Sequence, residues 1–389
     1  MITEHAILAP SSAGQWGFCT GSVAANRAAP DLVSERAREG TASHWVGEQV
    51  LNNWRKPGTD VLLCSDLIGR AAPNGVVIDE EMAEGADVWV RDVLDVANRH
   101  GALQRIEVER RVHMPTVHAD NWGTFDSAMW LAEADTLYVW DYKYGHREVN
   151  AVGNLQLIDY AIGLHHEISI HTNPDTRIVL RVVQPYCYHA PEQISEWVVS
   201  AAVLQGWAIH LAAKANEALT NPTMSAGLYC RDCAAITRCP TARRASYSVI
   251  DYANEPYQIE TLKGPDLAVE RAILTKGLVA VKARLGAIED ELQLQIQGGD
   301  TTSGLTVENK QGRLAWSVPV PQAIALGEQF GIDISKPGVV TPTQAIAAMP
   351  KEMRAAFTAV SQSATARPST GMKLVTLENS KTSRAFKRS

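Results

Sequence analysis

Two acidic residues and a lysine make the clearest chemical pattern in the chain. Residues 123–126 read Gly-Thr-Phe-Asp, and residues 141–145 read Asp-Tyr-Lys-Tyr-Gly. Because Asp141 and Lys143 are two residues apart, their side chains point to the same face if the segment is a strand. Asp126 and Asp141 on neighbouring strands would offer oxygen ligands to a hard divalent cation such as Mg²⁺ or Mn²⁺.

Such an arrangement suits phosphodiester hydrolysis. The cation would polarise a phosphate and activate water, and Lys143 would orient that water or stabilise charge in the transition state. The alternative is a cross-strand ion pair at the surface, which contributes little to stability. Leu137 and Val139 share the face of Asp141 and Lys143, and an exposed ion pair fits poorly beside these apolar residues.

Two further motifs lie on either side of this pattern. His44 ends the run Gly-Thr-Ala-Ser-His and would supply a nitrogen ligand; the alternative is a structural histidine. Gln156 and Tyr160 are four residues apart and therefore share a helical face. This pair offers an amide and a phenol to a substrate, and the alternative is a packing contact between the helix and the sheet.

The spacing of apolar residues predicts the elements that would position these motifs. Apolar residues recur at helical spacing over 79–100 and alternate with charged residues over 105–114, as in a strand. The same reasoning predicts helices over 34–54, 79–100, 154–165 and 191–220, and strands over 105–114, 123–131, 136–143 and 177–184. The first three strands read as an antiparallel meander. The order of elements predicts an α/β fold with a mixed sheet flanked by helices.

Composition shifts after residue 250. A long amphipathic helix is predicted over 265–297, followed by a hairpin that joins 305–307 to 314–316 and by short helices separated by prolines. We therefore expect three parts, which are a main domain over 1–250, a long amphipathic helix within 251–299, and a C-terminal accessory region with a basic tail over 300–389.

The cysteines divide into a cluster and two isolated residues. Cys230, Cys233 and Cys239 lie within ten residues of one another, and three thiols this close can ligate one metal centre. Cys19 is the expected fourth ligand, from the other end of the domain. Thiolates suit both zinc and iron. The two isolated cysteines are expected to be small buried residues, and they are Cys64 and Cys187.

Composition bounds the classes of function. The chain has 389 residues, 46% of them hydrophobic, and a net charge of −7, so it lacks the general basic footprint of a nucleic-acid-binding protein. DNA contact would rest on a local patch such as the tail with Lys381, Arg384, Lys387 and Arg388. No apolar run is long enough to span a membrane, and the N-terminus lacks signal-peptide features, so we expect a cytoplasmic protein. The absence of a P-loop motif argues against helicase activity.

Taken in order, the motifs resemble the nuclease domain of the RecB-like branch of the PD-(D/E)XK superfamily. The likeness covers roughly residues 10–240 and implies a restriction-endonuclease-like mixed sheet. It implies that Lys143 is catalytic together with both aspartates, and that Gln156 and Tyr160 lie beside the DNA. It also implies a set of ligands for Mg²⁺ or Mn²⁺, which are His44, Asp126, Asp141 and the main-chain carbonyl of Tyr142.

The cysteine layout extends the resemblance. One cysteine before the nuclease motifs and three after them is similar to AddB-type nucleases, which implies a helical subdomain closed by a 4Fe-4S cluster, with zinc as the alternative. The implied cluster ligands are Cys19, Cys230, Cys233 and Cys239. Asp141 stands where many members have Glu, but other members of the branch also have Asp, so no loss of activity is implied.

The resemblance implies a Mg²⁺- or Mn²⁺-dependent deoxyribonuclease, most simply an exonuclease acting in DNA recombination or processing. The whole layout is similar to nuclease-like proteins of phages and prophages, which implies a phage-infected or prophage-carrying bacterial host. DNA is the expected partner, together with a single-strand annealing protein, and an oligomer is compatible with the sequence. The alternatives are an endonuclease or flap nuclease, and a catalytically quiet DNA-binding or scaffold protein, against which the intact acidic set argues.

Overall fold

The computed structural model describes eight segments of the chain, which are residues 6–28, 35–187, 192–254, 264–311, 315–335, 341–351, 353–366 and 369–376. The chain divides into two compact units, Met1–Arg284 and Leu285–Ser389. All candidate site residues of the sequence belong to the first unit. The cationic tail that begins at Lys381 lies outside the described residues.

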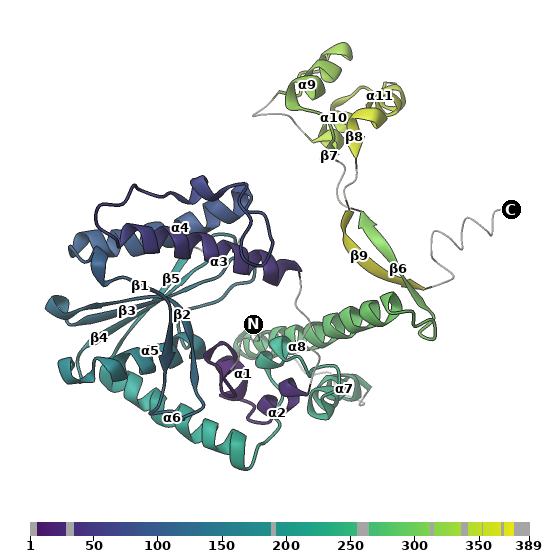
Figure 1. Cartoon of the computed structure of the whole chain (residues 1–389). Coiled ribbons are helices and arrows are strands. Elements are labelled where there is room, and N and C mark those ends of the chain that lie inside the picture. The colour runs from purple at the N-terminus through teal and green to yellow at the C-terminus, as the bar shows by residue number, and fades with distance from the viewer. Residues whose placement is uncertain are drawn as a thin grey trace. The chain divides into compact units, whose positions relative to one another are not determined.

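A five-stranded mixed sheet runs through the first unit (Figure 1). The strands stand in the order β1-β2-β3-β4-β5, and the β3–β4 pair is parallel whereas the other three pairs are antiparallel. The predicted meander of the first three strands is therefore confirmed. The bounds are Glu107–His113 for β1, Trp122–Leu131 for β2, Thr136–Tyr142 for β3, Arg177–Val183 for β4 and Ile194–Ser200 for β5.

Helices cover both faces of the sheet, which confirms a mixed α/β architecture. Figure 1 shows α3 (Glu35–Trp54) and α4 (Glu80–Arg99) on one face, and α5 (Leu155–Glu167) and α6 (Ala201–Thr220) on the other. The helix α5 belongs to the crossover that the parallel β3–β4 pair requires. Each face has its own apolar core, one packed under α3 and α4 and the other under α5 and α6.

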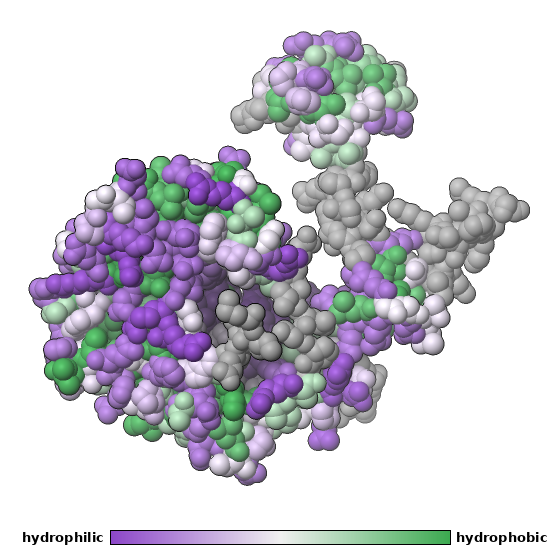
Figure 2. Space-filling view, in the orientation of Figure 1, coloured by the Kyte–Doolittle hydropathy of each residue, from purple (hydrophilic) through white to green (hydrophobic). Residues whose placement is uncertain are grey.

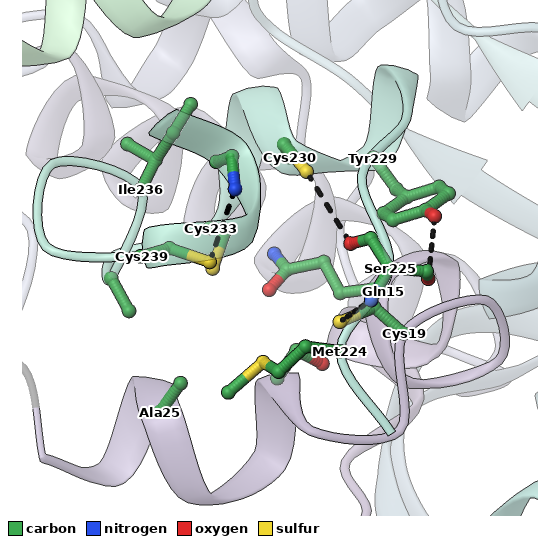
Figure 3. Close-up of a pocket in the computed structure, with 13 residues that line it drawn as sticks. Gln15, Cys19, Ala25, Met224, Ser225, Tyr229, Cys230, Cys233, Ile236 and Cys239 are labelled. Carbon is green, nitrogen blue, oxygen red and sulfur yellow. Dashed lines mark hydrogen bonds between the residues drawn. The ribbon is translucent and has the colours of Figure 1, made fainter. Parts of the chain in front are cut away.

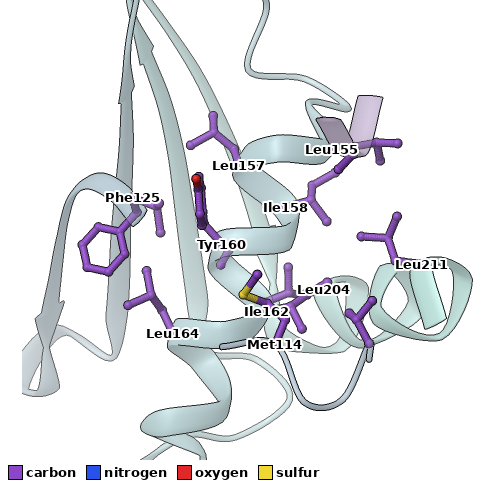
Figure 4. Close-up of a cluster of buried hydrophobic side chains, with 14 of the residues drawn as sticks. Met114, Phe125, Leu155, Leu157, Ile158, Tyr160, Ile162, Leu164, Leu204 and Leu211 are labelled. Carbon is purple, nitrogen blue, oxygen red and sulfur yellow. The ribbon is translucent and has the colours of Figure 1, made fainter. Parts of the chain in front are cut away.

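The core beneath α5 fixes this helix against the sheet. Figure 4 shows α5 between Phe125 of β2 on one side and Leu211 of α6 on the other. Leu157 and Ile158 of α5 are completely buried, and burying an aliphatic side chain contributes roughly 1.5–3 kcal/mol. Asn154 caps the helix by accepting a hydrogen bond from the backbone N–H of Gln156 at 3.0 Å. These contacts set the position from which α5 reaches the candidate site.

The helix predicted over 191–220 is wrong in its first part. Residues 194–200 form β5, which pairs with β4, and α6 begins only at Ala201. The β-branched and aromatic residues of Ile-Ser-Glu-Trp-Val-Val favour a strand on a half-buried surface. Ser200 marks the boundary, because its hydroxyl accepts a hydrogen bond from the backbone N–H of Val203 at 3.4 Å, as N-cap serines do.

The remaining helices of the first unit are short or lie near its ends. Cys19 lies in the short segment that joins the first two of these helices. A short 3₁₀ helix, η6 (Leu228–Asp232), carries Cys230. The bounds of the others are Ala13–Trp16 for α1, Ser22–Arg27 for α2 and Pro240–Asn254 for α7.

The long helix α8 spans Gly264–Gln297 and ends before Gly299, whose φ is +99°. Its apolar side chains lie on more than one side, and charged residues interrupt them. Among the described helices, none combines the length and apolar composition needed to cross a lipid bilayer. On the face of the first unit that Figure 2 shows, hydrophilic side chains predominate and apolar ones form scattered groups.

Strands from distant parts of the sequence pair in the second unit. β6 (Leu305–Gln311) pairs with β9 (Ser369–Thr376), and β7 (Ala315–Trp316) pairs with β8 (Thr365–Ala366). The predicted hairpin between 305–307 and 314–316 is therefore wrong, because turn residues indicate a local reversal but not the partner that each strand finds. The short helices are confirmed, with bounds Val320–Gln329 for α9, Pro342–Ala348 for α10 and Arg354–Ser361 for α11.

Gly163 lets α5 approach β1 closely, which predicts a defined stability loss. A Cβ atom there would lie 2.8 Å from the His113 carbonyl oxygen and 2.8 Å from side-chain atoms of Val112 and Met114. Gly163→Ala should lower the free energy of unfolding by about 1–3 kcal/mol. Gly206→Ala in α6 is the control, since no described atom lies within 4 Å of its Cβ, and it should gain up to about 1 kcal/mol. Equal urea midpoints for the two variants would contradict the close approach.

A buried carboxyl group ties α5 to the segment before β2. The two oxygens of Asp159 accept hydrogen bonds from Nδ2 of Asn121 at 2.9 and 3.0 Å, and both residues are completely buried. Desolvation raises the pKa of Asp159 to about 8, although the Asn121 donor opposes the shift. The folded protein therefore holds this proton more tightly than the unfolded chain, in which the pKa of an aspartate is about 3.9.

Because Asp159 holds a proton in the folded state, we expect the effect of Asp159→Asn on the free energy of unfolding to depend on pH. Because the pKa is raised in the folded state, the stabilising contribution of Asp159 is present below about pH 4 and is lost as the pH rises toward about 8. The variant does not titrate, and its amide would donate to Oδ1 of Asn121, which has no partner among the described residues. Above about pH 8 the variant should be more stable than the wild type by about 1–3 kcal/mol, and the gain should shrink in acid. A gain that does not change between about pH 5 and 9 in urea unfolding would rule out this protonation.

Candidate active site

The candidate site lies where β2 and β3 begin to pair. The paired region of the two strands starts at Ser127 and Trp140, and Asp126 and Asp141 are the next residues on each strand. Oδ2 of Asp126 accepts a hydrogen bond from the backbone N–H of Tyr142 at 2.6 Å. This bond fixes the Asp126 carboxylate against the end of β3, so both predicted acids and Tyr142 share one site.

His44 of α3 joins this site together with Glu109 of β1, an acid that the sequence pattern does not indicate. Nδ1 of His44 lies 3.6 Å from Oδ1 of Asp126 and 3.7 Å from Oε1 of Glu109 on β1. In the described part of the chain, these three residues are the one group of His, Cys, Asp or Glu side chains whose ligand atoms all lie within 4.8 Å of one another. The histidine proposed from the sequence therefore meets two carboxylates.

Lys143 links the second aspartate to α5. Its Nζ donates hydrogen bonds to Oδ1 of Asp141 at 2.9 Å and to Oε1 of Gln156 at 3.2 Å. Asp141 is only 2% exposed, and its Oδ2 has no hydrogen-bond partner among the described residues. A buried carboxylate oxygen without a partner is costly, so Asp141 retains the capacity to bind a further positive group.

Burial and charge act against each other throughout the site. Desolvation raises the pKa values of Asp126 and Asp141, although His44 and Lys143 oppose the shift. Burial also disfavours the charged forms of His44 and Lys143, but the neighbouring carboxylates outweigh it and raise both pKa values. A divalent cation would reverse the shifts of the carboxyl groups by stabilising their anionic forms.

Aromatic rings hold His44 in place. The rings of Trp89 and Tyr142 stack with centroids 5.3 Å apart, and the imidazole lies 5.9 Å from the first and 5.0 Å from the second. The Tyr142 hydroxyl hydrogen-bonds to that of Ser43 at 2.8 Å. Gly47, one turn after Ser43 on α3, leaves room for Trp89, since a Cβ there would lie 2.4 Å from the indole ring. The position of the imidazole therefore depends on packing rather than on its charged neighbours alone.

Of the two residues predicted to contact the substrate, Gln156 lies at the candidate site and Tyr160 lies in the apolar core. Gln156 is partly exposed and accepts the hydrogen bond from Lys143. Tyr160 is only 5% exposed and lies edge-on to Phe125 at 6.4 Å. Burial raises the pKa of Tyr160, and the carboxylates of Asp126 and Asp141 add to the shift. The phenol of Tyr160 therefore lies near the carboxylates of Asp126 and Asp141, but other side chains cover it.

Glu109 was missed because its role depends on strand register. In an alternating strand Glu109 shares a face with the charged residues Glu107 and Arg111. The solvent-exposed face of an ordinary edge strand has the same pattern. The β1–β2 pairing joins Val108 to Ser127 and Arg110 to Phe125, which places Glu109 opposite Asp126. No signal within the strand itself distinguishes Glu109 from its neighbour Glu107.

The three side chains fit a divalent cation. An octahedral cation about 2.1 Å from its ligands places neighbouring ligand atoms about 3.0 Å apart and opposite ones about 4.2 Å apart. The separations of 3.6 and 3.7 Å from His44 to Asp126 and to Glu109 fall within this interval. Imidazole and carboxylate donors suit Mn²⁺, and carboxylates suit Mg²⁺.

The four clustered cysteines line a second site. Two hydrogen bonds join the segment around Cys19 to the segment before Cys230. The N–H of Gly21 donates to the carbonyl oxygen of Thr223 at 2.9 Å, and the hydroxyl of Ser225 donates to the carbonyl oxygen of Phe18 at 2.8 Å. Figure 3 shows the pocket between these segments. The cysteines that line it are Cys19, Cys230, Cys233 and Cys239.

Backbone N–H groups donate to the sulfur atoms of the clustered cysteines. The donors and acceptors are Ser225 to Cys19 at 3.5 Å, Gly227 to Cys230 at 3.4 Å, and Ala242 to Cys239 at 3.5 Å. Such donors stabilise thiolates around a metal. A single tetrahedral zinc ion needs sulfur atoms about 3.8 Å apart, and no three of these cysteines bring their sulfur atoms within 4.8 Å. The four sulfur atoms therefore line the pocket without forming a compact group of ligands.

The two isolated cysteines are buried, as predicted, with exposed fractions of 3% for Cys64 and 9% for Cys187. Burial raises the pKa of Cys64 to about 12, which keeps it a neutral thiol. Neither of them lines the pocket of the cysteine cluster.

A family model described as "Protein of unknown function (DUF2800)" matches residues 5–382. The match contains His44, the acidic residues of the candidate site and all four clustered cysteines. Because it spans almost the whole sequence, the chain belongs to the DUF2800 family.

Proposed function

We propose that this protein is a metal-dependent DNA nuclease of the RecB-like PD-(D/E)XK type, most simply an exonuclease. The observation that carries the proposal is the convergence of His44, Asp126, Asp141 and Lys143 at one place in a mixed sheet. One helix, two strands and the residue that follows β3 contribute these four side chains.

The roles of the residues follow from their contacts. Asp126 and Asp141 would hold Mg²⁺ or Mn²⁺, with His44 and the main-chain carbonyl of Tyr142 completing the set. When bound, the cation polarises a phosphoryl oxygen and lowers the pKa of water. Lys143 is held between Asp141 and Gln156, so its ammonium is positioned to stabilise negative charge on a phosphate.

The substrate class rests on the same residues. A carboxylate cluster with one lysine suits hydrolysis of a phosphodiester, and Gln156 at the start of α5 offers an amide beside that lysine. An endonuclease or flap nuclease would use the same site, and the two differ in whether closed circular DNA is cleaved. A catalytically quiet DNA-binding or scaffold protein would not need the buried, unpartnered oxygen of Asp141.

We also propose that the cysteine pocket holds a 4Fe-4S cluster. The support is the set of four cysteines around one pocket and the backbone N–H groups that donate to their sulfur atoms. Four irons span more space than one ion and hold their thiolates farther apart. The cluster would join Cys19 to residues 230–239 and so close the first unit.

Three substitutions test the nuclease proposal. Asp126→Ala, Asp141→Ala and Lys143→Ala should each lower the cleavage rate by about a hundredfold to a thousandfold. The aspartate variants should also lose affinity for Mn²⁺, because they lack a ligand, whereas the lysine variant should keep it. Rates on end-labelled linear DNA and on closed circular DNA, with Mn²⁺ binding by calorimetry, measure these effects.

The control for these variants is Glu133→Ala. Glu133 lies in the turn between β2 and β3, is 72% exposed at its side chain and pairs with Arg105, so its removal should leave cleavage unchanged. Cleavage at the wild-type rate by both the Asp141 and the Lys143 variants would show that this site is not the active site.

The cluster proposal predicts a brown protein after anaerobic purification. Cys233→Ser should remove the visible absorption and the iron and should lower the melting temperature, because metal-binding free energy is partly folding free energy. Cys187→Ser is the control, since Cys187 does not line the pocket, and it should keep its iron. Colourless wild-type protein that holds one zinc ion per chain would contradict the proposal.

A further inference from the structure

We infer that Glu109 is a direct ligand of a divalent cation that His44 and Asp126 also bind. This inference rests on the proposed metal-dependent function and adds to the ligand set a residue from β1. The three ligand atoms are Nδ1 of His44, Oε1 of Glu109 and Oδ1 of Asp126.

The register of β1 and β2 places two like charges opposite each other. Val108 pairs with Ser127 and Arg110 with Phe125, so Glu109 and Asp126 occupy the positions between these pairs. Like charges directly opposite on antiparallel strands destabilise a sheet. Among the described residues, the one side chain within ion-pair distance of either carboxylate is His44.

The backbone of Glu109 adds a second cost. Its φ is +45°, which is uncommon for a residue other than glycine and costs of order 1–3 kcal/mol. The regular pairing of the two strands omits this position. The conformation interrupts the ladder at the residue whose side chain contacts His44, and a glutamate with only a structural role at the surface would gain nothing from this strain.

The neighbouring Asp141 supplies an independent sign that the cluster binds a positive group. It is 2% exposed, its Oδ2 has no partner among the described residues, and its charged neighbours include Asp126 and His44. The ammonium of Lys143 contacts the other oxygen, Oδ1. One lysine therefore does not satisfy the carboxylates of this cluster.

The two oxygens of Asp126 have different partners. Oδ2 accepts the hydrogen bond from the backbone N–H of Tyr142, whereas Oδ1 faces His44. The Tyr142 bond fixes the carboxylate and leaves Oδ1 for a cation. Glu109 completes the ligand set from the neighbouring strand, with Oε1 at 3.7 Å from Nδ1 of His44, a separation that a shared cation allows.

Manganese binding to the intact protein, without DNA, tests the inference. Glu109→Gln keeps the size of the side chain and removes its charge, and it should weaken Mn²⁺ binding by about tenfold or more in calorimetry and electron paramagnetic resonance. Glu107→Gln is the matched control on the same strand, because Glu107 pairs with Arg110 outside the cluster. Its Mn²⁺ affinity should equal that of the wild type.

Thermal melting separates a ligand from a structural partner. Without metal, Glu109→Gln should melt at or above the wild-type temperature, since a like charge opposite Asp126 is removed. With Mn²⁺ the order should reverse, because the wild type gains more from binding. If Glu109 served only as an ion-pair partner of His44, the variant would melt lower without metal and bind Mn²⁺ as tightly as the wild type.

The outcomes distinguish this inference from the proposed nuclease. Unchanged Mn²⁺ affinity in Glu109→Gln overturns the role of Glu109, even if the wild type cleaves DNA. A wild type that binds no Mn²⁺ also overturns it. If the variant binds Mn²⁺ more weakly and the wild type cleaves no DNA, the cation site is supported and the proposed nuclease function is contradicted.

Discussion

Repulsion among carboxylates in the interior of the sheet is the constraint on which the site depends. Glu109, Asp126 and Asp141 come from three adjacent strands, and two unit charges about 4 Å apart repel by about 4 kcal/mol at an effective dielectric constant of 20. His44 and Lys143 offset part of this repulsion through the contacts at 2.9–3.7 Å. The surrounding structure must therefore hold together a group of charges that would separate on their own.

The packing of α3 and α4 against the sheet holds these charges together against their repulsion. Trp89 and Tyr142 are fully buried and stacked, and the indole N–H of Trp140 donates to Asp92 at 2.7 Å. Asp92 also accepts a hydrogen bond from Arg181 of β4 at 2.8 Å, so α4 is tied to two strands. A buried ion pair adds little net stability but fixes positions. The rigid layer keeps the acids at separations that a cation can bridge.

The sequence predicted most of the elements and of the candidate site, and two of the features that it did not predict have a common cause. The alternation of 105–114 and the helical spacing of 79–100 are local signals, and both elements formed as expected. The partner of the strand at 305–311 is not a local property, because β9 lies more than fifty residues away. The role of Glu109 likewise requires the register of two strands, and a shift of one residue would turn it to the other face.

The cysteine pocket and the acidic site are physically connected within the first unit. Asp232, between two of the clustered cysteines, pairs with Arg147, four residues after Lys143, and its carbonyl oxygen accepts a hydrogen bond from Gln15 at 2.6 Å. Asn26, which lies 3.2 Å from Sγ of Cys233, donates a hydrogen bond to the same glutamine at 2.6 Å. A group bound by the cysteines would therefore order the segment that follows β3. The acids require a rigid frame, and this connection extends the frame from the sheet to the pocket that the four cysteines line.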